Sequence, residues 1–136
     1  MRKFSLILFL ILGLACNKDD DPEKYTSING AWVVRTPDDA TTVVFNVAVD
    51  SDNNPVVQSA SVTENGSPLT SQPIDAAIIV ISPQEVESVT LRADVFVIRL
   101  LDISVNNDFT EMEITNSIFL INGAFREFSG IKATRN

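Results

Sequence analysis

Residues 109–134 read FTEMEITNSIFLINGAFREFSGIKAT, and this stretch decides the fold. Two runs that alternate apolar and polar side chains flank Asn122-Gly123, a combination typical of a two-residue type I′ β-hairpin. The turn sets which residues of the two runs face each other. The pairs expected on the apolar face are Leu120 with Phe125, Ile114 with Ile131 and Met112 with Ala133, and the other face pairs the opposite charges of Glu113 and Lys132, which favours this register.

Two residues, Glu127 and Arg99, do not fit this pattern. The register places Glu127 opposite Ile118 on the apolar face, with Asn116 opposite Ser129 as the next pair. A buried carboxylate is costly unless it is paired or hydrated. Glu127 and Asn116 therefore either line a small polar cavity inside the domain, or a bulge or rim position turns Glu127 outward, and we favour the latter. Arg99, which has apolar neighbours, is expected on the solvent face with its stem covering them.

The rest of the chain also follows the period of two of β-strands and contains no convincing helical stretch. Turn residues recur at the spacing of an all-β sandwich or barrel. Residues 74–81 are apolar on both faces, so we expect this strand to be covered on both sides or to lie in the middle of a sheet. We predict one all-β antiparallel domain of about eight strands, either a flattened barrel, which we favour, or a β-sandwich. The predicted strands are residues 28–35, 42–49, 56–63, 74–81, 86–93, 95–105, 109–121 and 124–134.

The N-terminal residues have the pattern of an export signal. Residues 4–15 form an apolar stretch of the length of a signal-peptide core, which is too short to span a bilayer. The stretch ends at Ala15, and the only cysteine of the chain, Cys16, follows. This arrangement resembles the lipobox of bacterial lipoproteins, although Gly13 stands where that motif usually has leucine. The resemblance implies that the Cys16 thiol carries a diacylglyceryl group and that residues 1–15 are removed.

The residues after Cys16 are polar and acidic. Lys18, Asp19, Asp20 and Asp21 resemble the short lysine-then-acidic signal that directs some lipoproteins to the outer face of the outer membrane. The same residues also suit a solvated linker, and the two interpretations are compatible. We therefore divide the chain into a lipoprotein signal peptide (1–15), a lipidated acidic linker (16–26) and an all-β domain (27–136), with the protein expected in the outer membrane and exposed at the cell surface.

Charge and composition limit the chemistry. Without the signal, 8 basic residues stand against 18 acidic residues, a net charge of −10. Such a surface repels phosphate groups, so we expect no nucleic-acid partner and expect the lipid on Cys16, rather than a basic patch, to hold the protein at the membrane. The chain has no histidine and one cysteine. Disulfide frameworks, thiolate or imidazole metal sites and Ser-His-Asp triads are therefore excluded from the domain.

Two acidic patterns resemble a calcium-binding loop and a pair of catalytic carboxylates. Asp50, Asp52 and Asn54 are spaced like the first half of a calcium loop, but the glycine and the final glutamate of such a loop are missing, so turn formation explains them. Glu111 and Glu113 share one face of a strand, as a pair of hydrolytic carboxylates would, but such pairs arise by chance in an acidic chain. We expect no metal, no cofactor and no catalytic residue.

The run Asn29-Gly30-Ala31-Trp32 precedes the first strand. It resembles the Gly-x-Trp of lipocalin-like domains, in which the tryptophan closes one end of an eight-stranded barrel. The resemblance implies that a late basic residue, such as Arg126 or Arg135, lies near the closing strand.

These observations leave three functional hypotheses. The first is a non-catalytic binding or interaction module at the cell envelope, with a filled interior and a protein or glycan partner. The second is a lipocalin-like carrier of a small apolar ligand, with a cavity lined by residues 74–81 and 95–105. The third, a carboxylate hydrolase, needs an open cleft with two facing carboxylates. We favour the first and predict that the protein is not an enzyme.

Overall fold

The computed structural model describes residues 27–69 and 74–136. These residues form nine antiparallel strands in one sheet, in the order β4-β3-β2-β1-β9-β8-β7-β6-β5. The all-β antiparallel prediction is confirmed, and the ninth strand is the very short β4. The described ranges contain no helix that could cross a membrane. The strands are β1 (Gly30–Arg35), β2 (Thr41–Val49), β3 (Pro55–Glu64), β4 (Ser67–Pro68), β5 (Asp75–Ser82), β6 (Glu85–Ala93), β7 (Phe96–Val105), β8 (Glu111–Ile121) and β9 (Ala124–Arg135).

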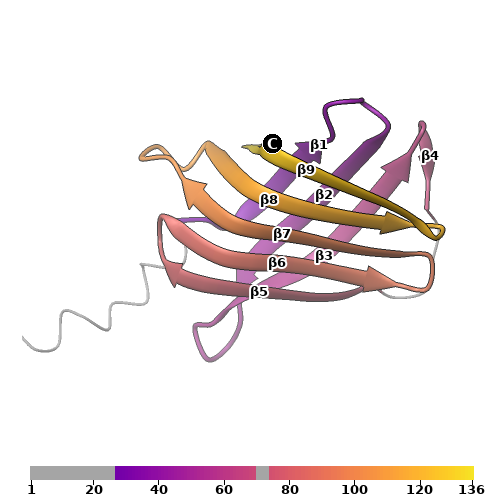
Figure 1. Ribbon diagram of the computed structural model, residues 1–136. Coiled ribbons are helices and arrows are strands. Elements are labelled where there is room, and N and C mark those ends of the chain that lie inside the picture. The colour runs from indigo at the N-terminus through magenta and orange to yellow at the C-terminus, as the bar shows by residue number, and fades with distance from the viewer. Residues whose placement is uncertain (1–26, 70–73) are drawn as a thin grey trace, which may run out of the picture.

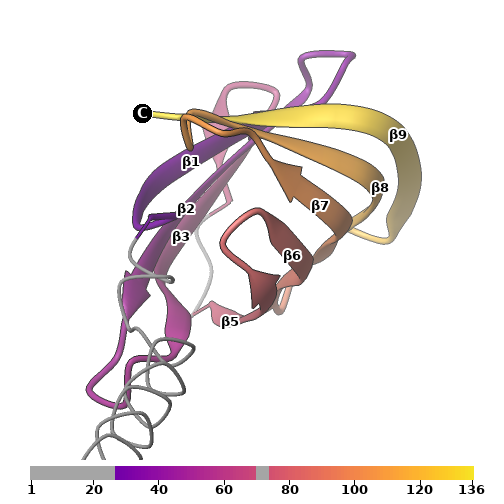
Figure 2. The ribbon, with the colours of Figure 1, turned by 90° about the vertical axis from the view of Figure 1, so that its left-hand side faces the viewer.

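The sheet curls into a half-barrel (Figure 1). Strands β1–β3 form one wall and β6–β9 the other, and Figure 2 shows the two walls facing each other. At the open side β3 and β5 are spatial neighbours. Within the described ranges, however, no ladder joins them, so the barrel remains unclosed there.

The C-terminal hairpin forms as predicted. Asn122 and Gly123 have φ angles of 50° and 81°, the positive values that a type I′ turn requires of both central residues. Every predicted pair is present, from Leu120 opposite Phe125 to Met112 opposite Ala133. Turn chemistry therefore determined the register of β8 and β9.

The buried face of each of these strands changes from one side to the other partway along the strand. The prediction that a single apolar face runs along the whole hairpin was therefore wrong. On β8, Met112 and Ile114 point inward, but from Ser117 onward the odd-numbered residues are the buried ones. Strands β6, β7 and β9 change sides at the matching position. The ladders skip one residue per strand there, and two of the four have left-handed backbones, with φ of 52° and 69°. The skipped residues, which define what we call the crease, are Glu87, Asp102, Thr115 and Gly130.

The crease corrects the expected positions of several side chains. Leu120 and Phe125 lie on the outer face rather than with Met112 in the core. Glu127 and Asn116 are both exposed, so neither is an interior polar group. The bulge interpretation of Glu127 was therefore the better one, because a local irregularity in both strands turns it outward without a change of register.

The position of residues 74–81 was also predicted wrongly. They form β5, which is an edge strand and not a central one. Ile79 and Ile81 on its outer face are 51% and 62% exposed. The apolar composition indicated burial on both faces, but the neighbour that would complete it is absent from the described part of the chain.

The core lies between the two walls. Trp32 and Phe45 from one wall meet Leu91, Leu100 and Phe119 from the other, and all five are 0% exposed. Phe119 also contacts the ring of Phe128 edge-on, with centroids 5.6 Å apart. Burial of each large apolar side chain is worth about 1.5–3 kcal/mol, so this layer holds the walls together.

Candidate functional site

The inward side chains of β7 pack into the space where a carrier would hold its ligand. Strand β7, which was expected to line such a cavity, sends Phe96, Ile98, Leu100 and Ile103 inward, and none is more than 2% exposed. A cavity that admits water leaves accessible surface on the side chains that line it. These four residues therefore line no water-sized cavity. The inward side chains of β5, such as Ile78, are only partly buried, because they border the unpaired edge.

One end of the half-barrel is closed by Trp32 and Arg135. The indole Nε1 of Trp32 donates a hydrogen bond of 2.8 Å to the carbonyl of Ile28. The guanidinium carbon of Arg135 lies 5.0 Å from the centre of the Trp32 ring. Its Nη2 donates to the carbonyls of Ser27 and Asn29, at 2.6 Å each. Arg135 thus fixes the point at which the chain enters the domain.

Gly30 is required by this arrangement. Its φ angle is 123°, a conformation that side-chain-bearing residues rarely adopt. A Cβ there would lie 3.6 Å from Nε of Arg135, an ordinary contact distance, so the backbone conformation and not a lack of space favours glycine. Of the two late basic residues named from the sequence, Arg135 is the one that covers the tryptophan.

Arg126 lies at the opposite end, near the β1–β2 turn. Its guanidinium contacts Asp38 at 3.1 Å and Glu64 at 3.2 Å. It also donates to Oγ1 of Thr41, which in turn donates to Glu64 at 2.7 Å. This network joins β9 to the ends of β2 and β3, which are not its ladder neighbours.

The pKa of Asp38 is lowered by the same network. The largest cause is the hydrogen bond that the Thr36 hydroxyl donates to the carboxylate, followed by the backbone N–H of Ala40. The charge of Arg126 acts in the same direction. Asp38 is therefore held ionised as a structural anion.

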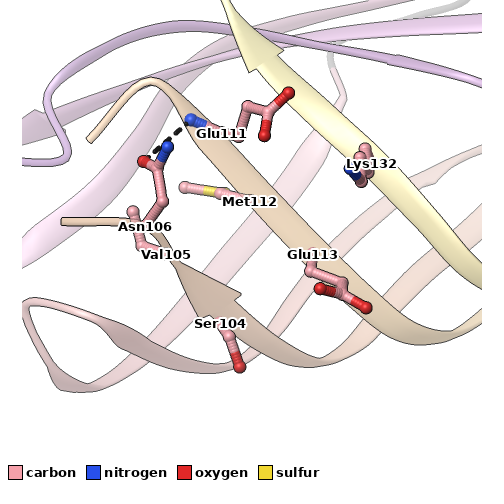
Figure 3. Close-up of a pocket in the computed structure, with 7 residues that line it drawn as sticks. All are labelled: Ser104, Val105, Asn106, Glu111, Met112, Glu113 and Lys132. Carbon is pink, nitrogen blue, oxygen red and sulfur yellow. Dashed lines mark hydrogen bonds between the residues drawn. The ribbon is translucent and has the colours of Figure 1, made fainter. Parts of the chain in front are cut away.

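The two carboxylates that were weighed as a hydrolytic pair, Glu111 and Glu113, border a shallow hollow of about 160 Å³ next to the β7–β8 turn (Figure 3). Glu113 lies opposite Lys132 in the ladder, as predicted. The backbone N–H of Glu111 donates a hydrogen bond to Oδ1 of Asn106, so this side-chain oxygen serves to hold the turn. The hollow is smaller than ordinary small-molecule sites, which measure about 300–1,000 Å³.

A second hollow of about 270 Å³ continues from the first along the crease, and the two share Ser104. Its carboxylates are Glu85, Glu87 and Asp102, and Ile81 of the edge strand closes its border. The two hollows form a shallow acidic groove on the outer face, with Lys132 as the one cation in its lining.

The calcium-like segment acts as a turn. Oδ1 of Asp50 accepts hydrogen bonds from the backbone N–H groups of Asp52 and Asn54, at 2.9 Å each. Within residues 27–69 and 74–136, no three Asp, Glu, His or Cys side chains gather as a metal site would.

The outer face between the crease and the Asn122-Gly123 turn carries the residues that sequence reasoning placed elsewhere. Leu120 and Phe125 are exposed there beside Glu127. Arg99 is exposed on the same side, as predicted. The signal that could have revealed this face is the uninterrupted apolar run at residues 118–121, which places apolar side chains on both sides of one strand.

The lipidation residue Cys16 and the export residues Lys18, Asp19, Asp20 and Asp21 lie outside the described residues. Comparison of the chain with protein-family models finds no match, and comparison with curated proteins finds no significant match.

Proposed function

We propose that this protein is a lipid-anchored lipoprotein of the cell envelope whose β domain is a non-catalytic interaction module. The proposal combines the lipobox-like residues around Cys16 with the filled interior of the domain. Binding partners would meet the outer face of β5–β9, which carries the acidic groove and exposed apolar side chains.

The tight packing of the inward side chains of β7 is the observation that favours an interaction module over a carrier. The side chains of β7 that would line a ligand cavity are at most 2% exposed. A ligand could enter the space lined by β7 only by displacing packed side chains, which costs several kcal/mol. An interaction through the surface requires no such change.

The entry point of the chain supports an anchored arrangement. Arg135 holds the carbonyls of Ser27 and Asn29, so a pull on the linker is transmitted to β9 and β1. The linker of residues 16–26 reaches at most about 3.5 Å per residue. The domain would therefore stay within about 40 Å of the lipid attached to Cys16.

The alternative is a lipocalin-like carrier of a small apolar ligand. It is favoured by the pairing of Trp32 with Arg135 and by the curled antiparallel sheet. Its ligand would need the partly buried apolar residues along the open edge, Ile78 and Val80 of β5 and Val57 of β3.

Three experiments test the proposal. Metabolic labelling with radioactive palmitate should label the full-length chain but not a Cys16→Ser variant, and protease treatment of intact cells should then remove the domain. Labelling that survives Cys16→Ser, or a domain that is digested only after lysis, would overturn the anchor or the surface location respectively. Titration with a fluorescent fatty acid separates the module from the carrier: the module shows no saturable binding, whereas one-to-one saturation supports the carrier.

A further inference from the structure

The outer face of β7, β8 and β9, between the crease and the Asn122-Gly123 turn, carries three rows of three side chains. Each row crosses the strands through the ladder, so its members are direct neighbours. We call this surface the nine-residue face. The rows, written from β7 to β9, are Val97–Leu120–Phe125, Arg99–Ile118–Glu127 and Leu101–Asn116–Ser129.

The first row is apolar throughout. Phe125 is 60% exposed and Leu120 is 38% exposed, although both are large enough for a core. Val97 beside them is half-buried. Contiguous exposed apolar side chains with a polar rim are typical of a surface that binds another protein.

The second row carries opposite charges on its two sides. Arg99 on β7 and Glu127 on β9 are separated by Ile118, and two strand spacings amount to about 10 Å. Within the described residues neither Arg99 nor Glu127 forms a salt bridge; the two that occur both belong to Arg126.

This pattern is complementary to itself. A two-fold axis that lies along β8, in the plane between two copies, turns each β9 over the β7 of the other copy. Arg99 then faces Glu127 of the partner subunit, and the same pair occurs a second time by symmetry. In the apolar row Val97 packs on Phe125 of the partner subunit, while Leu120 on the axis packs on its own copy. The third row pairs Leu101 with Ser129 of the partner subunit.

We propose that the nine-residue face is a homodimer interface in which two sheets pack outer face to outer face. Aligned sheets pack face to face in this way at about 10 Å. The face carries both signs of charge, and a rotation about β8 exchanges them, which is the match that an isologous interface requires.

The location of the face leaves it free in the anchored protein. The chain enters the domain where Arg135 holds Ser27, at the end of β9 opposite the Asn122-Gly123 turn. The face is three strands wide, and stable interfaces bury about 800 Å² per partner. The dimer is therefore weak in solution and is favoured when lipid anchors raise the local concentration.

Disulfide cross-linking of the full-length protein in its membrane tests the proposal. Leu120→Cys adds a thiol at the axis, where the residue is 38% exposed, whereas Ile81→Cys adds one at a more accessible site on β5, 62% exposed and outside the face. The proposal predicts much more cross-linked dimer from Leu120→Cys than from Ile81→Cys after mild oxidation. Equal yields from the two variants would show collision only and would overturn it.

Charge reversal supplies the second arm. In the Leu120→Cys background, Arg99→Glu places like charges opposite each other and should lower the cross-linked fraction by about tenfold or more. Adding Glu127→Arg restores complementarity and should restore the cross-link, which a folding defect would not allow. Arg92→Glu, an exposed reversal on β6 outside the face, is the matched control and should change nothing. Failure of the double reversal to rescue, or loss of the cross-link in the control, would contradict the proposed geometry.

Discussion

Replacing Phe119 by alanine measures how completely the interior is packed. Phe119 is 0% exposed, lies between the two walls and contacts the Phe128 ring edge-on at 5.6 Å. Truncation of a buried phenylalanine costs about 3–5 kcal/mol, because apolar contacts are lost and a cavity remains. Part of that loss, about 0.5–1.5 kcal/mol, belongs to the aromatic pair itself. We therefore expect Phe119→Ala to lower the free energy of unfolding by about 3–5 kcal/mol, a large fraction of a domain's stability.

Phe125→Ala is the matched control, because this substitution removes the same atoms from the same hairpin at a site that is 60% exposed. Phe125→Ala should cost less than about 1 kcal/mol. The assay is urea unfolding at low micromolar protein, where the domain is monomeric, followed by the fluorescence of Trp32, the only tryptophan. Equal losses in the two variants, or a cost of Phe119→Ala below that of Phe125→Ala, would refute the filled interior and revive the carrier.

Three further predictions concern the two ends of the half-barrel. Arg135→Met keeps an apolar stem over Trp32 but removes two hydrogen bonds to carbonyls, so the free energy of unfolding in urea should fall by about 2–3 kcal/mol. Arg135→Lys should recover part of this loss. An unchanged stability of Arg135→Met would contradict a stabilising role for the two hydrogen bonds. Gly30→Ala should cost about 1–3 kcal/mol by the same assay, because φ is 123° there, and an unchanged midpoint would exclude strain. Asp38 has a lowered pKa in the folded state, so its contribution is present above the unfolded pKa of about 3.9 and is lost as the pH falls through the folded value. Asp38→Asn should therefore be less stable than the parent at pH 7 and should lose less stability on acidification, and parallel curves would contradict this.

Local chemistry explains which parts of the fold were predictable. The hairpin register followed from Asn122-Gly123 and the alternating pattern, since both depend on neighbouring residues. The Gly-x-Trp resemblance named Arg126 and Arg135 as candidates for a late basic residue near the closing strand, and only the structure places Arg135 against Trp32. The salt-bridge network of Arg126 was not anticipated, because Asp38 and Glu64 reach it only when β9 curls past strands that are not its ladder neighbours.

Part of the candidate binding surface was beyond prediction for a related reason. Strict alternation assigns every second residue of a strand to the same face. It therefore does not predict that four neighbouring strands switch their buried face at one position. The crease at Asp102 and Gly130 makes that change, so Leu120 and Phe125 lie on the surface instead of in the expected core. Edge position is equally invisible in sequence, because residues 74–81 carry the composition of a central strand.

By itself the sequence determined the class of the fold, the register of its last hairpin and the absence of histidine and thiol chemistry from the domain. It also carries the lipobox-like pattern at Cys16, which no folding of the domain alters. Only the tertiary structure decided that the inward side chains of β7 are fully packed and that Arg99 and Glu127 share one outer face. The physical reason is that register and turns depend on adjacent residues. The packing of the core and the side of the sheet on which each side chain lies depend on how the whole sheet twists and bends.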